Sequence, residues 1–416
     1  MIPSRAVAVA LPALGLALAA CGSDGAAADA APPLPDAHYP STIECAGDVA
    51  PDGDPVLPKN IIVIMGDGMG PVQVQAGGII NGGPLALEGV SDAVYVNTDS
   101  LTTDAADVPD DEPTDSAAAA TAMATGVRTA NDVVGLDPDG AELETIADLA
   151  KAAGKSVGIV TNSFLYDASP AAFYAHTDNR DDHDAILTAL VTDAQPDVIL
   201  GGGRELFEAL GGTYLNLAVD AGYFVIHDDA ELAAWDPTAN PMALGLFQGS
   251  AVSEAPSLWE WFTTPVALRD DTSTDPRLPA MAQRALDALD DNDAGFFLFV
   301  ENEHIDTLGH IALIKRELAA EGMPLEVVEV DATVEVALAW IEQSSSFDET
   351  LLIVTADHET GGYGFYMDDL GDPSWWASPF HSRQPVAVYA RGPGAENLAS
   401  LCRGADVFRL MTGRLP

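Results

Sequence analysis

Six stretches of this chain are continuous runs of apolar residues, each of about the length of one β-strand. They are Asn60–Met65, Ser156–Thr161, Val198–Leu200, Gly295–Val300, Leu351–Thr355 and Val386–Ala390. Runs without polar alternation suit strands that are buried on both faces of a parallel sheet. Helical periodicity lies between them, most clearly at Glu142–Ala153, Leu278–Leu289 and Val327–Glu342. The alternation predicts an α/β fold, in which helices cover both faces of a central, mostly parallel sheet.

This alternation extends over residues 59–413, which we interpret as a single domain. Residues 204–277 interrupt it with Pro, Gly and Asp and with the pair Trp259 and Trp261. We interpret that stretch as an irregular peripheral region of loops and short elements within the same domain.

The N-terminus has the layout of an export signal. Residues 1–20 carry one charge, Arg5, followed by the apolar run Ala6–Ala20, which is short for a transmembrane span. The run ends in Leu18-Ala19-Ala20-Cys21, which looks like a bacterial lipobox with Cys21 as the lipidated residue. A plain secretory signal is the alternative. Residues 21–58 are rich in Ala, Gly and Pro and predict a flexible tether. We therefore expect an exported protein in the bacterial periplasm or cell envelope, attached to a membrane only through Cys21.

Two further cysteines, Cys45 and Cys402, lie near the two ends of the predicted domain. An exported chain folds in an oxidising compartment, where these thiols can form a disulfide. Two separate buried thiols are the alternative, and the sequence leaves both open.

The charge balance excludes several classes of partner. The chain has 65 Asp and Glu against 17 Lys and Arg, a formal net charge of -48. Such a field repels nucleic acids and anionic membranes, so we expect no nucleic-acid binding. It also repels phosphate, which makes bound cations necessary for phosphate chemistry. We interpret most of these carboxylates as a solvated acidic surface suited to high salt.

Acidic and imidazole groups follow several of the predicted strands. Ligands of open α/β sheets bind just outside the carboxyl ends of the strands. The groups at those ends are Asp67, the segment from Ser163 to Asp167, Glu301 and Asp357. Their convergence on one edge of the sheet predicts a site there.

One serine stands at the predicted start of a helix. Asp115-Ser116 precedes an alanine-rich stretch that ends before Gly126, a residue typical of helix C-termini. Free N–H groups and the helix dipole stabilise anions at such a position, which favours Ser116 as a nucleophile. The alternative is a serine that only caps the helix.

Paired aspartate and histidine residues predict a metal centre. Asp306 and His310 are four residues apart, so one helical turn points both at the same ion. Asp357 and His358 form a second pair, in a tight turn after a strand. A surface ion pair is the alternative for either pair alone. Together with Asp67, Glu301 and His381 there are enough ligands for two or three divalent cations. Mixed His/Asp sites suit Zn²⁺, and all-oxygen sites suit Mg²⁺.

Six segments resemble the signatures of the alkaline phosphatase family in both order and separation. They are Gly66-Asp-Gly-Met-Gly70, Thr114-Asp-Ser-Ala-Ala118, Leu200-Gly-Gly-Gly-Arg204, Thr274-Asp-Pro276, Gly295 to Glu301 and Thr355-Ala-Asp-His358. Single motifs of this kind are weak, but six in register are specific. The resemblance extends from about Lys59 to Leu410 and covers essentially the whole predicted domain.

The resemblance implies two zinc ions and one magnesium ion. It assigns the first zinc to Asp306, His310 and His381, and the second to Asp357, His358 and Asp67, with Ser116 facing it. Magnesium would bind Asp67, Ser169 and Glu301, where Ser169 stands in place of the threonine of many relatives. Arg180 takes the place of the arginine that clamps phosphate with its planar fork. A surface arginine is the alternative for Arg180.

Other residues take supporting places in the same pattern. Asp115, Asp167 and His176 flank the predicted ligands, and His176 is interpreted as a supporting or structural residue. Thr307 follows Asp306 where better-known relatives carry lysine or histidine, so a positive charge is absent there. Glu303 and His304 replace small or neutral residues.

The function implied is hydrolysis of small phosphate monoesters through a phosphoserine. In that mechanism the second zinc activates Ser116, the first stabilises the leaving oxygen, and Arg180 neutralises the phosphate. One alternative is a phosphodiesterase or sulfatase of the same superfamily. The other is a non-catalytic, acidic, cation-binding surface lipoprotein, which would need neither Ser116 nor Arg180. The oligomeric state stays open, with a homodimer as one expectation.

Overall fold

The computed structural model describes residues 43, 45, 54–101, 113–247, 274–364 and 376–414. The predicted signal peptide, Cys21, nearly all of the predicted tether and the pair Trp259 and Trp261 lie outside them. All the described residues belong to one compact unit, Tyr39–Pro416.

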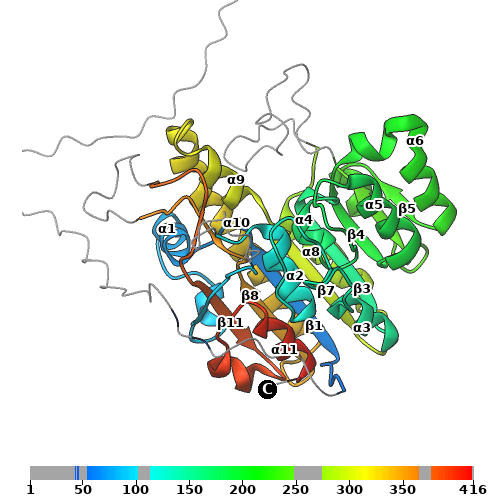
Figure 1. Ribbon diagram of the computed structural model, residues 1–416. Helices are drawn as coiled ribbons and strands as arrows, with labels where there is room; N and C mark the ends of the chain where they lie inside the picture. The colour runs from blue at the N-terminus through cyan, green and yellow to red at the C-terminus, as the bar shows by residue number, and fades with distance from the viewer. Residues whose placement is uncertain are drawn as a thin grey trace, which may run out of the picture. The chain divides into compact units, whose positions relative to one another are not determined.

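Within the described residues, one nine-stranded sheet has the order β2-β11-β8-β1-β7-β3-β4-β6-β5 (Figure 1). Its strands are β1 Asn60–Gly66, β2 Val94–Val96, β3 Ser156–Phe164, β4 Val198–Gly202, β5 Phe224–Ile226, β6 Ala243–Leu246, β7 Phe296–Asn302, β8 Thr350–Thr355 and β11 Val386–Arg391. From β8 to β5 all neighbours are parallel. Only β11 is antiparallel to both of its neighbours, β8 and β2. Two short strands, β9 Glu359–Thr360 and β10 His381–Ser382, form a separate antiparallel pair.

The helices form layers on both faces of this sheet. They are α1 Pro71–Asn81, α2 Ser116–Thr125, α3 Ile146–Ala152, α4 Ala168–Ala171, α5 His183–Thr188, α6 Arg204–Ala221, α7 Asp229–Ala234, α8 Leu278–Leu289, α9 His304–Ile311, α10 Arg316–Ser344 and α11 Asp406–Thr412. Shorter turns are the 3₁₀ helices η1 Leu87–Gly89 and η4 Ala395–Ser400 and the π-helix η2 Ala189–Ala194. Helices α1, α8 and α10 pack together as one layer, and α2, α3 and α11 pack together as another. No helix in the described ranges has both the length and the apolar character needed to cross a bilayer.

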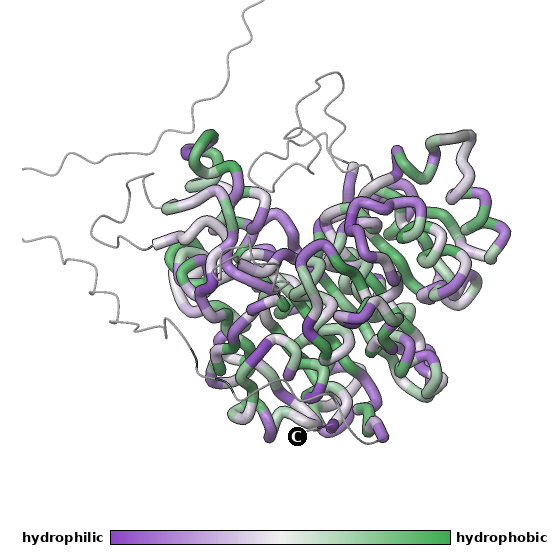
Figure 2. Tube along the Cα trace, viewed as in Figure 1, coloured by the Kyte–Doolittle hydropathy of each residue, from purple (hydrophilic) through white to green (hydrophobic). Residues whose placement is uncertain are grey.

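Strand β7 shows why its sequence is apolar without alternation. Phe296 packs edge-on against Trp340 of α10, with ring centroids 5.2 Å apart. Phe297 and Phe299 point to the opposite face and contact Phe173, at 5.7 and 4.2 Å. Both faces of the strand are therefore covered, as a parallel sheet between two helical layers requires. The hydropathy of the chain along this core is drawn in Figure 2.

The predicted fold class is confirmed, and each of the six predicted runs forms a strand of the main sheet. Helix α8 has the predicted bounds, but α3 begins at Ile146 because Thr145 and Asp148 form a capping box. Helix α10 begins at Arg316, well before the predicted Val327, and continues through Pro324. Proline usually ends a helix, which is why the sequence pattern placed the start too late.

The described part of residues 204–277 is more regular than the interpretation as loops and short elements predicted. Helix α6 is 18 residues long, and β6 and β5 extend the parallel sheet beyond β4. Two features hide these elements in the sequence. Gly211 and Gly212 interrupt the helical periodicity, and Gly245 interrupts a short strand. A side chain at Gly245 would lie 2.6 Å from Phe247 and 2.7 Å from Leu200, so close packing requires glycine.

Cys45 and Cys402 are joined by a disulfide, with Cα atoms 5.8 Å apart. The structure therefore has the bridge and not the two separate thiols. The closed loop spans 357 residues, almost the entire domain. Because a long loop loses much chain entropy in the unfolded state when it is cross-linked, such a bridge stabilises a fold by about 2–5 kcal/mol.

Candidate metal centre and nucleophile

The sheet brings the acidic residues of three neighbouring strands to one edge. In the register of the sheet, Met65 of β1 pairs with Glu301 of β7 on one side and with Thr355 of β8 on the other. Asp67 and Asp357 each lie two residues beyond the paired positions of their strands. The carboxyl ends of parallel strands meet at the same edge, so these side chains converge as predicted.

The first cluster consists of Asp67, Asp357 and His358. The three residues offer ligand atoms that all lie within 4.8 Å of one another. His358 Nε2 is 3.1 Å from Asp357 Oδ2 and 3.6 Å from Asp67 Oδ1. Ser116 Oγ lies 3.3 Å from the same imidazole nitrogen. A hydroxyl and three potential ligands therefore face one point in the interior.

The second cluster consists of Asp306, His310 and His381. His310 Nε2 lies 3.0 Å from Asp306 Oδ2 and 3.1 Å from His381 Nε2. His381 Nε2 is 3.4 Å from Asp306 Oδ1. The outer nitrogens of both imidazoles meet backbone carbonyls, Pro379 O at 2.6 Å and Thr114 O at 2.7 Å. Such contacts fix the rings and leave each Nε2 directed at the cluster.

The two clusters adjoin each other through His358. Its ring stacks on that of His381 with centroids 3.5 Å apart. Asp306, His358 and His381 also place ligand atoms within 4.8 Å of one another. Two ions held in these clusters would therefore be neighbours, as a two-metal site for phosphoryl transfer requires.

Unsatisfied buried atoms show that the first cluster fits a cation. Asp67 Oδ1 and Asp357 Oδ2 are buried and make no hydrogen bond to the described residues. Burial, and then the charge of Asp357, raises the pKa of Asp67 well above its ordinary value. Burial raises the pKa of Asp357 to about 7, and it lowers the pKa of His358 well below the ordinary range. Two carboxylates and an imidazole nitrogen supply the mixed oxygen and nitrogen donors that a divalent cation can bind, and a bound cation would favour the ionised form of both carboxylates.

A third group contains oxygen donors alone. Ser169 Oγ donates to Asp67 Oδ2 at 3.2 Å, and Glu301 Oε2 accepts from Thr161 Oγ1 at 2.6 Å. Burial raises the pKa of Glu301 to about 8, although the hydroxyl of Thr161 partly offsets it. Oxygen donors of this kind suit Mg²⁺, and Asp67 connects the group to the first cluster.

Ser116 is the first residue of α2, and Asp115 is the residue that caps this helix. Asp115 Oδ1 accepts from the N–H of Ala118 at 2.9 Å, while Gly126 ends the helix in the left-handed conformation. The alternative that Ser116 serves as the cap is therefore wrong. Its hydroxyl is left to contact His358 at the positive end of the helix dipole.

Arg180 lies between two of the predicted supporting residues. Its NH1 is 3.1 Å from Asp115 Oδ2, and its NH2 is 3.2 Å from Asp167 Oδ1. Burial opposes its charge, but Asp167 and Asp115 keep its pKa above the ordinary value. Because Asp115 adjoins Ser116, the guanidinium is held beside the serine and not on an open surface.

His176 stands apart from both clusters. Its Nε2 contacts the carbonyl oxygen of Leu143 at 2.9 Å, a bond between loops. Its ring also packs near Gly135, where an added side chain would lie 2.9 Å from it. These contacts are those of a structural residue.

The N-terminal part of α9 and the residue before it contain polar groups whose placement the sequence did not predict. Thr307 Oγ1 donates to Glu303 Oε1, while Glu303 Oε2 is buried without a hydrogen bond to any described residue. Burial, and then the charge of Asp306, raises the pKa of Glu303 well above its ordinary value. Asn162 bonds both the N–H of Glu303, at 2.8 Å, and His304 Nδ1, at 3.1 Å.

Two more residues beside the clusters were missed. Thr360 donates to Asp306, and the buried carboxylate of Glu359 accepts from Gln73 at 2.8 Å and from Ser382. The available signal was their position directly after Asp357-His358. Strand β9 is only two residues long, so no periodicity marks it.

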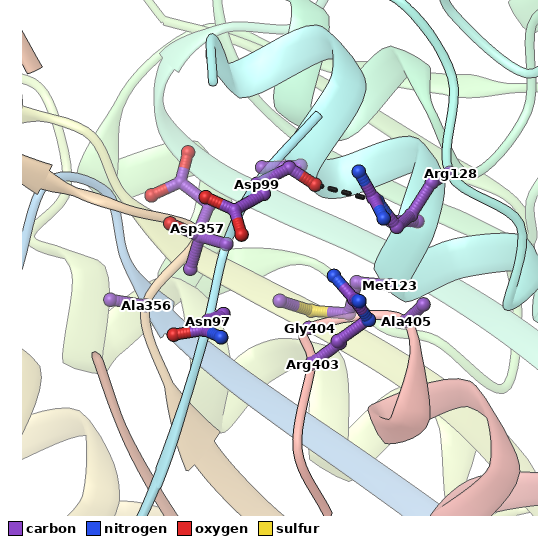
Figure 3. Close-up of a pocket in the computed structure, with 12 residues that line it drawn as sticks. Asn97, Asp99, Met123, Arg128, Ala356, Asp357, Arg403, Gly404 and Ala405 are labelled. Atoms are coloured by element: carbon purple, nitrogen blue, oxygen red, sulfur yellow. Dashed lines mark hydrogen bonds between the residues drawn. The ribbon is translucent and has the colours of Figure 1, made fainter. Parts of the chain in front are cut away.

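A cavity with an empty volume of about 290 Å³, open solvent included, adjoins Asp357 (Figure 3). Its walls include Asn97, Met123, Arg128 and Arg403. Arg128 donates to the carbonyl of Asp99 at 2.8 Å. Neither Ser116 nor a histidine lines it, so it is a feature beside the clusters and not their entrance.

Comparison with known proteins identifies one family. The sequence profile of the alkaline phosphatase family matches residues 58–380. Alkaline phosphatase 4 of Bacillus subtilis is 32% identical over 337 residues, covering 80% of this chain and 67% of that protein. The alkaline phosphatase of Escherichia coli K12 is 30% identical over 425 residues, covering 86% of each.

Solved structures of the same name share the fold. A cold-active alkaline phosphatase from a psychrophilic Shewanella superposes with a TM-score of 0.67 at 26% identity, covering 86% of this chain and all (100%) of that one. The Thermus thermophilus alkaline phosphatase superposes with a TM-score of 0.70 at 22% identity, covering 88% of this chain and 94% of that one. A mutant of the alkaline phosphatase from the Antarctic bacterium TAB5 has magnesium bound in a site called M3. It superposes with a TM-score of 0.66 at 23% identity, covering 86% of this chain and 98% of that one.

We expect divalent cations to stabilise the fold strongly. Cations bind only the folded clusters, so a hundredfold excess over the dissociation constant adds about 2.7 kcal/mol per site. Calorimetric unfolding with zinc and with a chelator measures this difference. Asp357→Asn should unfold at a higher temperature than the wild type under chelation, because one buried negative charge is removed, yet gain less from zinc. Asp291→Asn, on the surface, is the control. Equal unfolding temperatures of the wild type with and without chelator would contradict the metal centre.

Proposed function

This chain belongs to the alkaline phosphatase family, and we propose that its two clusters serve a hydrolysis of phosphate monoesters in which Ser116 becomes phosphorylated. As a member of that family it is a metal-dependent phosphomonoesterase. The observation that carries the proposal is the hydroxyl of Ser116, 3.3 Å from His358 Nε2 at the N-terminus of α2.

We assign one zinc ion to each cluster and a magnesium ion to the third group. The mixed donors of Asp306, His310 and His381, and of Asp67, Asp357 and His358, support zinc. The oxygen donors Asp67, Ser169 and Glu301 support magnesium, as does the magnesium in the M3 site of the TAB5 mutant. When bound, these cations act as Lewis acids that stabilise the serine alkoxide and the charged oxygens of the phosphoryl group.

In the first half-reaction, Ser116 Oγ forms a bond to phosphorus while the bond from phosphorus to the ester oxygen breaks, and the proton lost by Ser116 ends on the alcohol that leaves. The free N–H groups at the start of α2 face the anion that develops there. In the second half-reaction, a water oxygen attacks the phosphoserine and the bond to Oγ breaks. Inorganic phosphate leaves, and Ser116 Oγ takes up a proton that the attacking water gives up.

The guanidinium of Arg180 positions the phosphate in both halves. Asp115 and Asp167 each hold one of its nitrogens, which fixes the plane of the fork. A fixed fork can donate to two phosphate oxygens at once, so less side-chain entropy is lost on binding. The phosphate of a diester has one fewer free oxygen for the clamp and the cations to bind than that of a monoester, which favours monoesters as substrates. A protein that only stores cations would need neither this clamp nor Ser116.

Ser116→Ala should reduce turnover of an aryl phosphate by about 10³-fold or more, because the covalent intermediate cannot form. Zinc content and phosphate binding should persist, since the clusters and Arg180 are intact. Steady-state hydrolysis, elemental analysis and calorimetric titration with phosphate measure the three quantities. Ser400→Ala, on an exposed turn, is the control. Near-normal turnover in the zinc-loaded Ser116 variant would remove this serine from the mechanism.

Arg180→Ala should weaken inhibition by phosphate by about ten- to a hundredfold, the value of a charge-assisted hydrogen bond of roughly 1.5–3 kcal/mol. The inhibition constant of Arg180→Lys for phosphate should lie between those of the wild type and Arg180→Ala, because a lysine keeps the charge but not the planar fork. Zinc content should not change in either variant. The control is Arg204→Ala, whose partner Glu208 lies one helical turn away on the surface. An unchanged inhibition constant in Arg180→Ala would show that the side chain does not touch phosphate.

We propose that the enzyme acts outside the cytoplasm of a bacterium, in the periplasm or at the cell envelope, anchored by lipid on Cys21. The support is the apolar run Ala6–Ala20 and the sequence Leu18-Ala19-Ala20-Cys21. Mass spectrometry of the mature N-terminus should find an acylated Cys21. Cys21→Ser should release the enzyme from membranes or block its maturation, with Ser23→Ala as the control. An unmodified N-terminus beyond residue 21 would leave only secretion.

A further inference from the structure

One hydroxyl group lies between the two clusters. Thr360 Oγ1 donates to Asp306 Oδ1 of the second cluster, and it lies 3.3 Å from His358 Nδ1 of the first. Thr360 is 1% exposed, so water does not compete for these bonds. The same hydroxyl therefore contacts one ligand residue of each cluster.

The chemistry of the hydroxyl fixes the direction of both bonds. A hydroxyl has one hydrogen to donate, and its oxygen has lone pairs that accept. The ionised carboxylate of Asp306 can only accept, so it takes the hydrogen of Thr360. The oxygen of Thr360 is then left to accept from His358, which must carry its hydrogen on Nδ1. The lone pair of that imidazole is consequently on Nε2, the atom that faces Asp67 and Asp357.

The backbone around Thr360 holds this hydroxyl in place. Its N–H donates to the carbonyl of Gly68 at 3.3 Å, and it pairs with His381 in the register of β9 and β10. A side chain at Gly68 would lie 2.7 Å from Thr360 Oγ1, and one at Gly309 would lie 2.7 Å from Thr360 Cγ2. Both glycines leave room for one placement of the threonine, with its methyl group on Gly309 and its hydroxyl between the clusters.

We propose that Thr360 is a positioning residue that bridges the two cation sites. It orients the carboxylate of Asp306 for one site and selects the Nδ1–H tautomer of His358 for the other. Groups that orient metal ligands in this way typically change metal affinity by 10- to 100-fold. The inference rests on the proposed function, in that each cluster is taken to hold one zinc ion.

The test compares zinc affinity at both sites in four variants. Thr360→Val replaces the hydroxyl with a methyl group, and Thr360→Ala removes it without adding atoms, so a clash of the valine cannot be mistaken for a lost bond. Thr360→Ser keeps the hydroxyl. Thr333→Val is the matched control, because Thr333 is equally buried and, among the residues that the structure describes, its hydroxyl bonds only the carbonyl of Glu329. Competition with a chromophoric chelator gives two dissociation constants for each protein, and elemental analysis gives the stoichiometry.

Thr360→Val and Thr360→Ala should both weaken zinc at both sites, by about 10- to 100-fold each. Thr360→Ser and Thr333→Val should bind as the wild type does. Unfolding of the zinc-free proteins in denaturant separates this effect from a general loss of stability, which Thr333→Val should share.

Three results would overturn the inference in distinguishable ways. Wild-type affinity at both sites in Thr360→Ala would show that the hydroxyl does not position the ligands, while the proposed function would stand. Weakening at only one site would remove the bridge and leave a local contact. A wild-type protein that binds fewer than two zinc ions would overturn the two-zinc proposal itself, and the bridge with it.

Discussion

The structure depends on buried like charges that the protein alone does not neutralise. Asp67 and Asp357 face each other across the end of the sheet, and the free oxygen of each has no hydrogen-bond donor among the described residues. Burying an unpaired carboxylate costs several kcal/mol, and the raised pKa values of both residues reflect that cost. Divalent cations would stabilise the ionised carboxylates, which would couple folding of the site to metal binding. The same residues thus limit stability without metal and create affinity for it.

The fold supplies the rigidity that such a cluster needs. Strands β1, β7 and β8 are adjacent and in register, so their ends are fixed by backbone hydrogen bonds on both sides. The other ligands stand on short elements that are tied to this edge. Helix α9 presents Asp306 and His310, and β10 presents His381 through its pairing with β9. A site built on strand ends and braced loops can hold repelling groups within bonding distance.

The sequence predicted the sheet and the ligands for different reasons. Uninterrupted apolar runs identify strands because a strand between two helical layers has no polar face. The candidate ligands Asp67, Glu301 and Asp357 could be predicted because they come directly after those runs. Elements whose formation depends on tertiary contacts were missed: α6 with its internal glycines, β5 and β6 with few residues, and the two-residue strand β9. Thr360 belongs to this last class, since its role arises only where β9, α9 and the first cluster meet.

The charges around the proposed phosphate position limit how a strongly acidic chain can bind an anionic substrate. Eight carboxylates belong to the clusters and their surroundings, and Arg180 supplies a guanidinium there; the carboxylates are those of Asp67, Asp115, Asp167, Glu301, Glu303, Asp306, Asp357 and Glu359. The three proposed divalent cations and Arg180 would carry seven positive charges, one fewer than these carboxylates if all were ionised. Thr307 adds no positive charge to this balance, and Glu303 adds a negative one. The loaded site would then be close to neutral before phosphate arrives, so a net attractive field cannot be what holds the substrate. Direct coordination and the two-pronged contact of Arg180 must provide the affinity, and both act only at bonding distance.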